Sequence, residues 1–164
     1  MKRFVIALAV LLGIVASVGA VQAQGFEKGD WALTLSGGGV SSKDLDNSSF
    51  TLNVAPSYFL SNEFELGVRQ TIAYSDGFTG ATVGFLDFNF RMENRKFVPY
   101  VGANFGYSYG EGVSDAWRLG PEVGLKYFVN ETTYVYGNVS YEFDLNDGFD
   151  NGGFVYGVGI GFKW

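Results

Sequence analysis

Apolar and polar residues alternate along most of the chain that follows residue 30. In residues 154–164, bulky apolar side chains occupy every second position and glycine occupies most of the positions between them. A period of two places successive side chains on opposite faces of a β-strand. The alternation recurs in eight stretches, most of them near the length of about ten residues that a membrane-spanning strand has. The predicted strands cover residues 31–36, 50–60, 64–74, 80–91, 97–107, 117–127, 134–143 and 154–164.

Two kinds of position break this regular pattern. In residues 80–91, Val83 and Phe85 fall on the face that is otherwise polar. A β-bulge or a lumen layer of mixed polarity would account for them. Pro56 and Pro121 lie inside predicted strands, although proline cannot donate to a strand ladder. We therefore expect both prolines near strand ends or bulges.

The connections between the predicted strands alternate in length. Short turns are expected at residues 61–62, 93–96 and 130–132. Longer polar loops are expected at residues 37–48, 75–79, 110–115 and 145–152. Short turns on one side and long loops on the other are typical of outer-membrane barrels. The pattern thus predicts an all-β fold, an eight-stranded antiparallel up-and-down transmembrane barrel, with the loops outward and both termini periplasmic.

The polarity of the two strand faces separates a membrane barrel from a soluble one. A soluble barrel keeps its outer face polar and fills its interior with apolar groups. Here one face is densely aliphatic and aromatic, and the other carries small, polar and charged residues that suit a narrow interior. In water, the bulky face would form an apolar belt far larger than monomers expose. A closed barrel in lipid also pairs every backbone group, so we expect the membrane form.

The N-terminal stretch has the composition of an export signal. Lys2 and Arg3 precede an uncharged apolar run at residues 4–15, and small residues follow. We expect signal peptidase to cleave after Ala23, with Ala20 as a weaker alternative site. An uncleaved helical anchor is the other interpretation, because residues 4–21 contain no charge and approach the length of a spanning helix. The predicted division is a signal peptide at residues 1–23 and an outer-membrane barrel domain at residues 24–164.

Charge and composition narrow the possible chemistry. The chain has 11 basic and 17 acidic residues, and loss of Lys2 and Arg3 leaves 9 basic residues and a net charge of about −8. That sign disfavours nucleic acid as a partner. Cysteine and histidine are absent, which removes thiolate ligands and the most common general base and metal ligand. Ser-His-acid catalysis therefore has no base, and we expect no enzyme activity, no metal and no cofactor.

Charged side chains recur on the face assigned to the lumen. Such groups need partners or water in a narrow interior. We expect a salt-bridge network that plugs the lumen, with Glu65 or Glu122 paired to Arg69, Arg118 or Lys126. The alternative is a gate, in which a change of partners opens a narrow ion path. The predicted polar network comprises Glu65, Arg69, Asp87, Arg91, Arg118, Glu122, Lys126 and Glu142.

The last long loop is rich in carboxylates. Residues 144–151 have a superficial likeness to a calcium-binding loop, but Gly148 stands fifth where the EF-hand pattern requires glycine sixth. We interpret the acidic loops as solvated surface. The alternative is that divalent cations bridge them to lipopolysaccharide phosphates.

Several segments together resemble the outer-membrane β-barrel domain family, the OmpA/OmpX-like eight-stranded porin-like proteins. They are residues 99–107, 120–127 and 141–143, together with the alternating C-terminal end. The resemblance implies the barrel fold, an outer-membrane location, contact with outer-membrane lipid and lipopolysaccharide, and recognition by the barrel assembly machinery. The C-terminal Trp164 departs from the phenylalanine that is more usual in the family. The implied assembly signal is Tyr156, Val158, Ile160, Phe162 and Trp164.

The family includes envelope-stabilising, adhesive and pore-forming members, so the resemblance specifies the fold better than the function. No peptidoglycan-binding domain is expected after the barrel, which leaves out the tethering role of larger relatives. We expect a structural or surface-interaction protein with a polar, plugged lumen. The alternative is a narrow channel for small solutes or apolar compounds. The content of the lumen distinguishes these two functions, because Tyr100, Tyr134 and Tyr136 should fill a plugged barrel.

Overall fold

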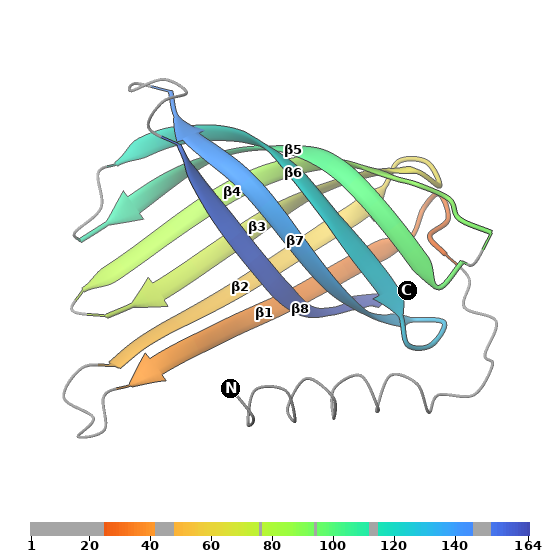
Figure 1. Cartoon of the computed structure of the whole chain (residues 1–164), viewed down its shortest axis with the longest axis horizontal. Coiled ribbons are helices and arrows are strands. Elements are labelled where there is room, and N and C mark those ends of the chain that lie inside the picture. Colours follow the sequence, from red (N-terminus) through yellow and green to blue (C-terminus); the bar gives the residue numbers. More distant parts are fainter. Residues whose placement is uncertain (1–24, 42–47, 76, 94, 112–114, 146–151) are drawn as a thin grey trace, which may run out of the picture.

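The computed structural model describes residues 25–41, 48–75, 77–93, 95–111, 115–145 and 152–164. Eight strands form one closed barrel in which each strand is antiparallel to its neighbours in sequence, and β1 also pairs with β8 (Figure 1). The strands are β1 (Trp31–Ser41), β2 (Ser48–Phe59), β3 (Phe64–Tyr74), β4 (Phe78–Asn89), β5 (Phe97–Gly110), β6 (Ala116–Phe128), β7 (Thr133–Asp144) and β8 (Gly153–Lys163). The expected fold class is confirmed.

The strand bounds follow the alternating pattern closely, except where glycine interrupts it. β1 continues to Ser41 through Gly37, Gly38 and Gly39, although the alternating pattern predicted a loop from residue 37. These residues pair with β2 in unbroken register, as in Gly38 with Thr51. Glycine has no side chain to place on either face, so the strand gave no periodic signal there. In the described part of the chain, no helix is long and apolar enough to span a membrane.

β4 contains no bulge. Its residues pair with β3 and β5 in unbroken register, and Val83 and Phe85 point to the lumen side with Asp87. Phe85 is buried, and the ring lies over Gly67 of β3, where an added Cβ would come 2.3 Å from the ring. A mixed lumen layer is therefore the correct explanation of the irregular pattern. The missing side chain of Gly67 provides the room for the ring.

The prolines are accommodated without bulges. Pro56 pairs with Leu33 of β1, and Pro121 pairs with Ala103 of β5. On the other edge of β2, the ladder to β3 has no pair at Pro56 and resumes in the same register. On the other edge of β6, the ladder to β7 likewise has no pair at Pro121 and resumes in the same register. The expectation of strand ends or bulges is wrong for Pro121, which lies in the middle of β6. Because proline cannot donate to a ladder, the pairing is missing beside each proline, and only a local part of one ladder is lost.

The connections at residues 60–63, 90–96 and 129–132 and the C-terminus lie at one end of the barrel, which we call the short-turn end (Figure 1). Side chains stabilise two of the turns. Ser61 Oγ accepts a hydrogen bond from Phe64 N at 3.0 Å, and Asn130 Oδ1 accepts one from Thr133 N at 2.8 Å. Local capping by serine and asparagine explains why these connections stay tight. The other four connections lie at the opposite end, which we call the long-loop end. The expected difference in length does not hold for every connection, because residues 90–96 between β4 and β5 form a longer connection than residues 75–77 between β3 and β4.

Candidate functional site in the barrel lumen

A buried ion pair occupies the lumen near the short-turn end. Lys126 Nζ of β6 contacts Glu65 Oε2 of β3 and donates to Asn89 Oδ1 of β4 at 2.9 Å. Glu65 also accepts hydrogen bonds from Ser57 Oγ at 2.6 Å and from Asn89 Nδ2 at 3.3 Å. Four strands therefore contribute to this first polar layer. The carboxylate receives three donors, which is what burial of its charge requires.

A second ion pair lies deeper in the lumen, four residues along β3 and β6 from the first. Arg69 of β3 makes a two-pronged contact with Glu122 of β6, with nitrogen–oxygen distances of 3.1 and 3.2 Å. Tyr100 Oη donates to Glu122 at 3.1 Å, and Asn104 Nδ2 donates to it at 2.9 Å. The guanidinium also lies 5.3 Å from the ring centre of Phe85. Bidentate geometry and full use of the acceptor oxygens make this a strong contact.

Both ion pairs connect the same two strands across the interior. β3 and β6 are not neighbours in the sheet, so each pair crosses the lumen rather than following its wall. The Glu122 side chain is 0% exposed and that of Glu65 is 2% exposed. Both pairs are among those expected from the sequence. Side chains that meet from opposite walls leave little space between the walls in these two layers.

The other residues of the predicted network are not members of these two ion pairs. Asp87 is buried beside Glu65, and its Oδ1 has no hydrogen-bond partner in the described part of the chain. Arg118 and Glu142 are half-buried on the lumen face nearer the long-loop end. Glu142 accepts a hydrogen bond from Ser140 Oγ at 3.3 Å. These three side chains face the interior, but they are not members of the two cross-lumen pairs.

Arg91 does not belong to the lumen. β4 ends at Asn89, so Arg91 follows the strand and its side chain is 58% exposed at the short-turn end. Its Nε pairs with Glu63 Oε1 at 3.0 Å. Placing Arg91 in the lumen network was therefore wrong, because the alternating pattern was extended two residues past the end of the strand.

An aromatic cluster closes the short-turn end beneath the polar layers. Phe26, which precedes β1, is only 5% exposed and stacks on Phe59 with ring centres 4.1 Å apart. It also makes edge-to-face contacts, with its ring centre 5.0 Å from that of Phe128 and 5.3 Å from that of Tyr134. Lys126 Nζ lies 5.1 Å from the centre of the Phe26 ring. The ring thus packs directly against the first ion pair, and we call residues 25–30 the N-terminal plug.

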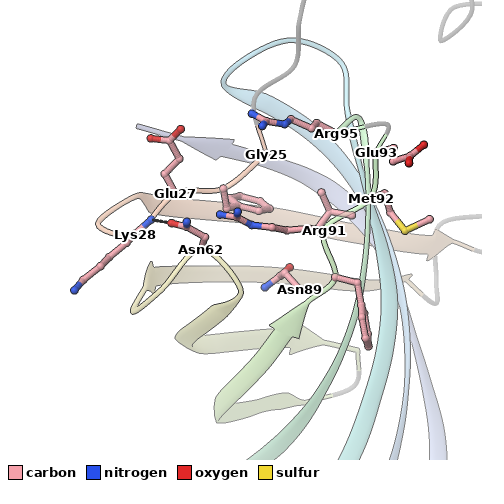
Figure 2. Close-up of a pocket in the computed structure, with 12 residues that line it drawn as sticks. Gly25, Glu27, Lys28, Asn62, Asn89, Arg91, Met92, Glu93 and Arg95 are labelled. Carbon is pink, nitrogen blue, oxygen red and sulfur yellow. Dashed lines mark hydrogen bonds between the residues drawn. The ribbon is translucent and has the colours of Figure 1, made fainter.

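Polar contacts hold the N-terminal plug in place. Lys163 Nζ of β8 pairs with Asp30 Oδ2 at 2.9 Å and donates to the carbonyl of Gly25 at 2.9 Å. On the other side, Lys28 N donates to Asn62 Oδ1 at 2.6 Å. A pocket of about 690 Å³ lies beside the plug (Figure 2). The pocket walls carry Lys28, Arg91 and Arg95 together with Glu27 and Glu93, so the pocket has no single charge sign.

Replacing Phe26 with alanine is expected to release the N-terminal plug while the barrel stays folded. The variant loses the ring stack, and the remaining polar contacts lie partly in water, where each contributes little. Trypsin should then cleave after Lys28 severalfold faster in the folded barrel, measured by mass spectrometry of the digested protein. Phe97→Ala, which truncates an outward ring that is 41% exposed, is the matched control. Unchanged cleavage in Phe26→Ala would mean that the ring does not hold the plug.

Several important residues were absent from the sequence expectations. Asn89 and Asn104 complete the two polar layers, and Phe26 forms the plug. The asparagines occupy lumen positions of the alternating pattern, which could have indicated them. Phe26 gave no periodic signal because it precedes the first strand.

The residues assigned to the assembly signal lie on the outer face of β8 and just after it. Trp164 exchanges two backbone hydrogen bonds of 3.0 Å with Trp31. Recognition of this segment by the assembly machinery stays a prediction. The predicted cleavage site at Ala23 lies outside the described residues, as does most of the acidic segment of the last loop.

Comparison with known proteins places these features in a structural class. A family model described as "Protein of unknown function, DUF481" matches residues 85–164. No curated protein matches the sequence. The N-terminal β-barrel domain of Pseudomonas aeruginosa OprF is similar in structure, with a TM-score of 0.65 and 16% identity, over 84% of this chain and 98% of that one.

Two further solved structures share the architecture. The outer membrane protein OprG from Pseudomonas aeruginosa has a TM-score of 0.57 and 14% identity, covering 88% of this chain and 99% of that chain. Neisserial surface protein A has a TM-score of 0.55 and 15% identity, covering 82% of this chain and 94% of that chain. At such low identities the likeness is one of fold. The chain thus has the closed eight-stranded fold of outer-membrane β-barrels.

Proposed function

We propose that the chain is a non-catalytic outer-membrane β-barrel whose lumen is closed and whose role is structural or one of surface interaction. Its long loops face outward and both termini lie in the periplasm. Outer-membrane lipid and lipopolysaccharide surround it. Two features support this function, the apolar outer belt and the filled lumen.

The outer belt supports a lipid environment. Val68, Val101 and Val123 are 48%, 43% and 52% exposed, although they lie well inside their strands. Such a belt would be unfavourable in water, and in lipid it costs nothing. The belt continues around the barrel through outward residues of β2 to β7. These include Leu52, Ile72, Leu86, Phe105, Leu125 and Val135.

The cross-lumen ion pairs are the main observation in favour of a closed lumen. Two buried carboxylates meet two cations from the opposite wall, and Phe26 lies directly beneath the first pair. Moving either pair apart would leave a buried charge without a partner, which is strongly unfavourable. An ion path through both layers would therefore require both pairs to separate. This favours the closed lumen over the narrow channel.

Conductance in planar bilayers tests the proposal. We expect the folded wild-type protein to give no stable single-channel steps, because two layers of paired side chains block the lumen. The variant Arg69→Ser/Glu122→Ser removes both charges of one layer together and leaves neither ion unpaired. With Phe26→Ala and Glu65→Ser/Lys126→Ser added, we expect the same barrel to conduct.

Heat-dependent gel mobility and circular dichroism establish that each protein is folded before it is added to the bilayer. A conducting multiple variant beside a silent wild type would support the closed lumen. Stable, salt-dependent steps from the wild type would contradict it and favour the narrow channel. Separation of inner and outer membranes tests the location independently, and recovery in the inner membrane would contradict the outer-membrane assignment.

A further inference from the structure

The junction that closes the barrel is paired over only part of its length. β1 and β8 pair from Ala32 with Lys163 to Ser36 with Gly159, and Trp31 and Trp164 extend the pairing at the short-turn end. Beyond Ser36, β1 continues to Ser41 and, among the described residues, pairs only with β2. Figure 1 shows β1 and β8 separating toward the long-loop end. We call the two edges beyond this point, residues 37–41 of β1 and 153–158 of β8, the seam.

The other junctions have no comparable opening. The β4–β5 ladder, for example, runs from Thr79 with Gly110 at the long-loop end to Asn89 with Tyr100. On β8, the opposite edge pairs with β7 as far as Gly153 with Glu142. The seam edges therefore belong to ordered strands that have one partner each. Within the described residues, the seam is the place where the wall of the barrel is open.

The side chains along the seam are unusually accessible. Val158 and Tyr156 on the outer face are 76% and 73% exposed, whereas the outward Val123 of β6 and Val135 of β7 are 52% and 36% exposed. Val155 alternates to the lumen face, yet it is 46% exposed. The seam thus presents apolar side chains on the outer face of β8 and, through Val155, on its lumen face. This surface continues directly into the apolar belt.

The chemistry of the two edges defines what can occupy the seam. A strand edge presents free N–H and C=O groups, and these are costly in an apolar medium unless something satisfies them. A pure hydrocarbon would cover Val155 and Val158 but would leave the peptide groups unpaired. Water would solvate the peptide groups but not the apolar side chains. An occupant with an acyl chain and a hydrogen-bonding head group satisfies both.

A second copy of the chain that docks through its own β8 edge fits less well. Two copies in one membrane have the same orientation, so a two-fold axis lies along the membrane normal. Their β8 edges would then run in the same direction, and the antiparallel ladder that β8 forms with β7 and β1 would not be reproduced.

We propose that the seam binds a bilayer lipid of the leaflet nearer the long loops, with an acyl chain against Val155, Tyr156 and Val158 and head-group oxygens at the peptide groups of Gly37–Gly39. The inference rests on the proposed membrane location. The glycines suit this contact, because no side chain projects between the edge of β1 and an approaching head group. A site of this kind would hold one lipid more firmly than the surrounding belt does.

Photochemical cross-linking tests the site in the full barrel. The protein is placed in vesicles of phosphatidylethanolamine and phosphatidylglycerol that contain phosphatidylethanolamine with a diazirine on its acyl chain. After illumination, mass spectrometry compares adducts on residues 153–158 with adducts around Val123 and Val135. We expect severalfold more adducts at the seam. Equal labelling would overturn the inference and leave the membrane location standing, whereas labelling of neither region would contradict the membrane location itself.

Cysteine pairs test whether the seam stays open, and the chain has no cysteine of its own. If the β1–β8 register continued, Gly38 would stand opposite Gly157. A Cβ at Gly38 meets nothing within 4 Å, and one at Gly157 meets only the movable amide of Asn138. Under mild oxidation in the same vesicles, we expect Gly38→Cys/Gly157→Cys to remain reduced and the paired control Leu35→Cys/Ile160→Cys to form a disulfide.

A bridge requires Cα atoms within about 7 Å, so it reports closure directly. Complete bridging of the seam pair would show that β1 and β8 close on themselves and would overturn lipid binding there. A peptide strand from another protein would instead protect the seam from the lipid probe while leaving the seam pair reduced, and that outcome would also overturn the proposal.

Discussion

Replacing Lys126 with methionine should destabilise the barrel by about 3–5 kcal/mol, the cost of removing one partner from a buried ion pair. Lys126 Nζ contacts Glu65 and Asn89, and its side chain is only 4% exposed. The variant leaves the Glu65 carboxylate in the interior with only neutral donors. Methionine keeps most of the volume against Phe26, so the loss comes chiefly from the charge. Unfolding in guanidinium, followed by tryptophan fluorescence of the protein in lipid vesicles, measures it.

Two controls separate the charge from its surroundings. Glu65→Gln/Lys126→Met removes both charges, and we expect it to recover much of the lost stability because no unpaired ion remains. Arg91→Met breaks the ion pair between Arg91 and Glu63, whose side chains are 58% and 34% exposed, respectively. We expect this change to lower the free energy of unfolding by at most about 1 kcal/mol. A double variant as unstable as Lys126→Met alone would show that packing, not the buried charge, dominates at this position.

The alternating pattern predicted the architecture because lipid and lumen impose opposite demands on successive residues. One face must be apolar and the other must fit a narrow polar interior, so each of the eight strands carries its own signal. Phe154 to Trp164 shows this most plainly, with bulky residues outside and glycines that make room for Tyr134 and Tyr136 inside. Ion pairing between Glu65 or Glu122 and a lumen cation followed from the cost of burying charge.

Other features left no periodic trace. The extension of β1 through Gly37–Gly39 has no side chains to alternate, and Arg91 continued the pattern beyond the last residue of β4. Phe26 is one apolar residue in a polar segment, and its burial depends on a space formed by Phe59, Phe128 and Tyr134 from distant strands. The pairing partners of the lumen charges also depend on which walls face each other, a property of the closed barrel alone.

Close approach of two strands makes Gly120 the least tolerant of a side chain among the glycines that the structure describes. A Cβ there would lie 1.8 Å from the carbonyl oxygen of Tyr141 in β7, and only 3.0 Å from the Cα of Glu142. The atoms it meets are backbone, so no rotation of a side chain relieves the clash. The neighbouring Pro121 has no N–H to offer, and the β6–β7 ladder skips this position. β6 and β7 therefore approach closely at a point where their ladder has no pairing.

Gly120→Ala should therefore destabilise the barrel by about 3 kcal/mol or more, the upper range for overpacking a filled interior, or prevent folding altogether. Gly137→Ala is the matched control in β7, because a Cβ at that glycine meets Gly157 O only at 3.7 Å. Alanine restricts the unfolded chain more than glycine does, so the control should be neutral or slightly more stable. Guanidinium unfolding and heat-dependent gel mobility of both variants measure the difference. If Gly120→Ala folds as readily as Gly137→Ala, β6 and β7 do not approach each other this closely in the membrane.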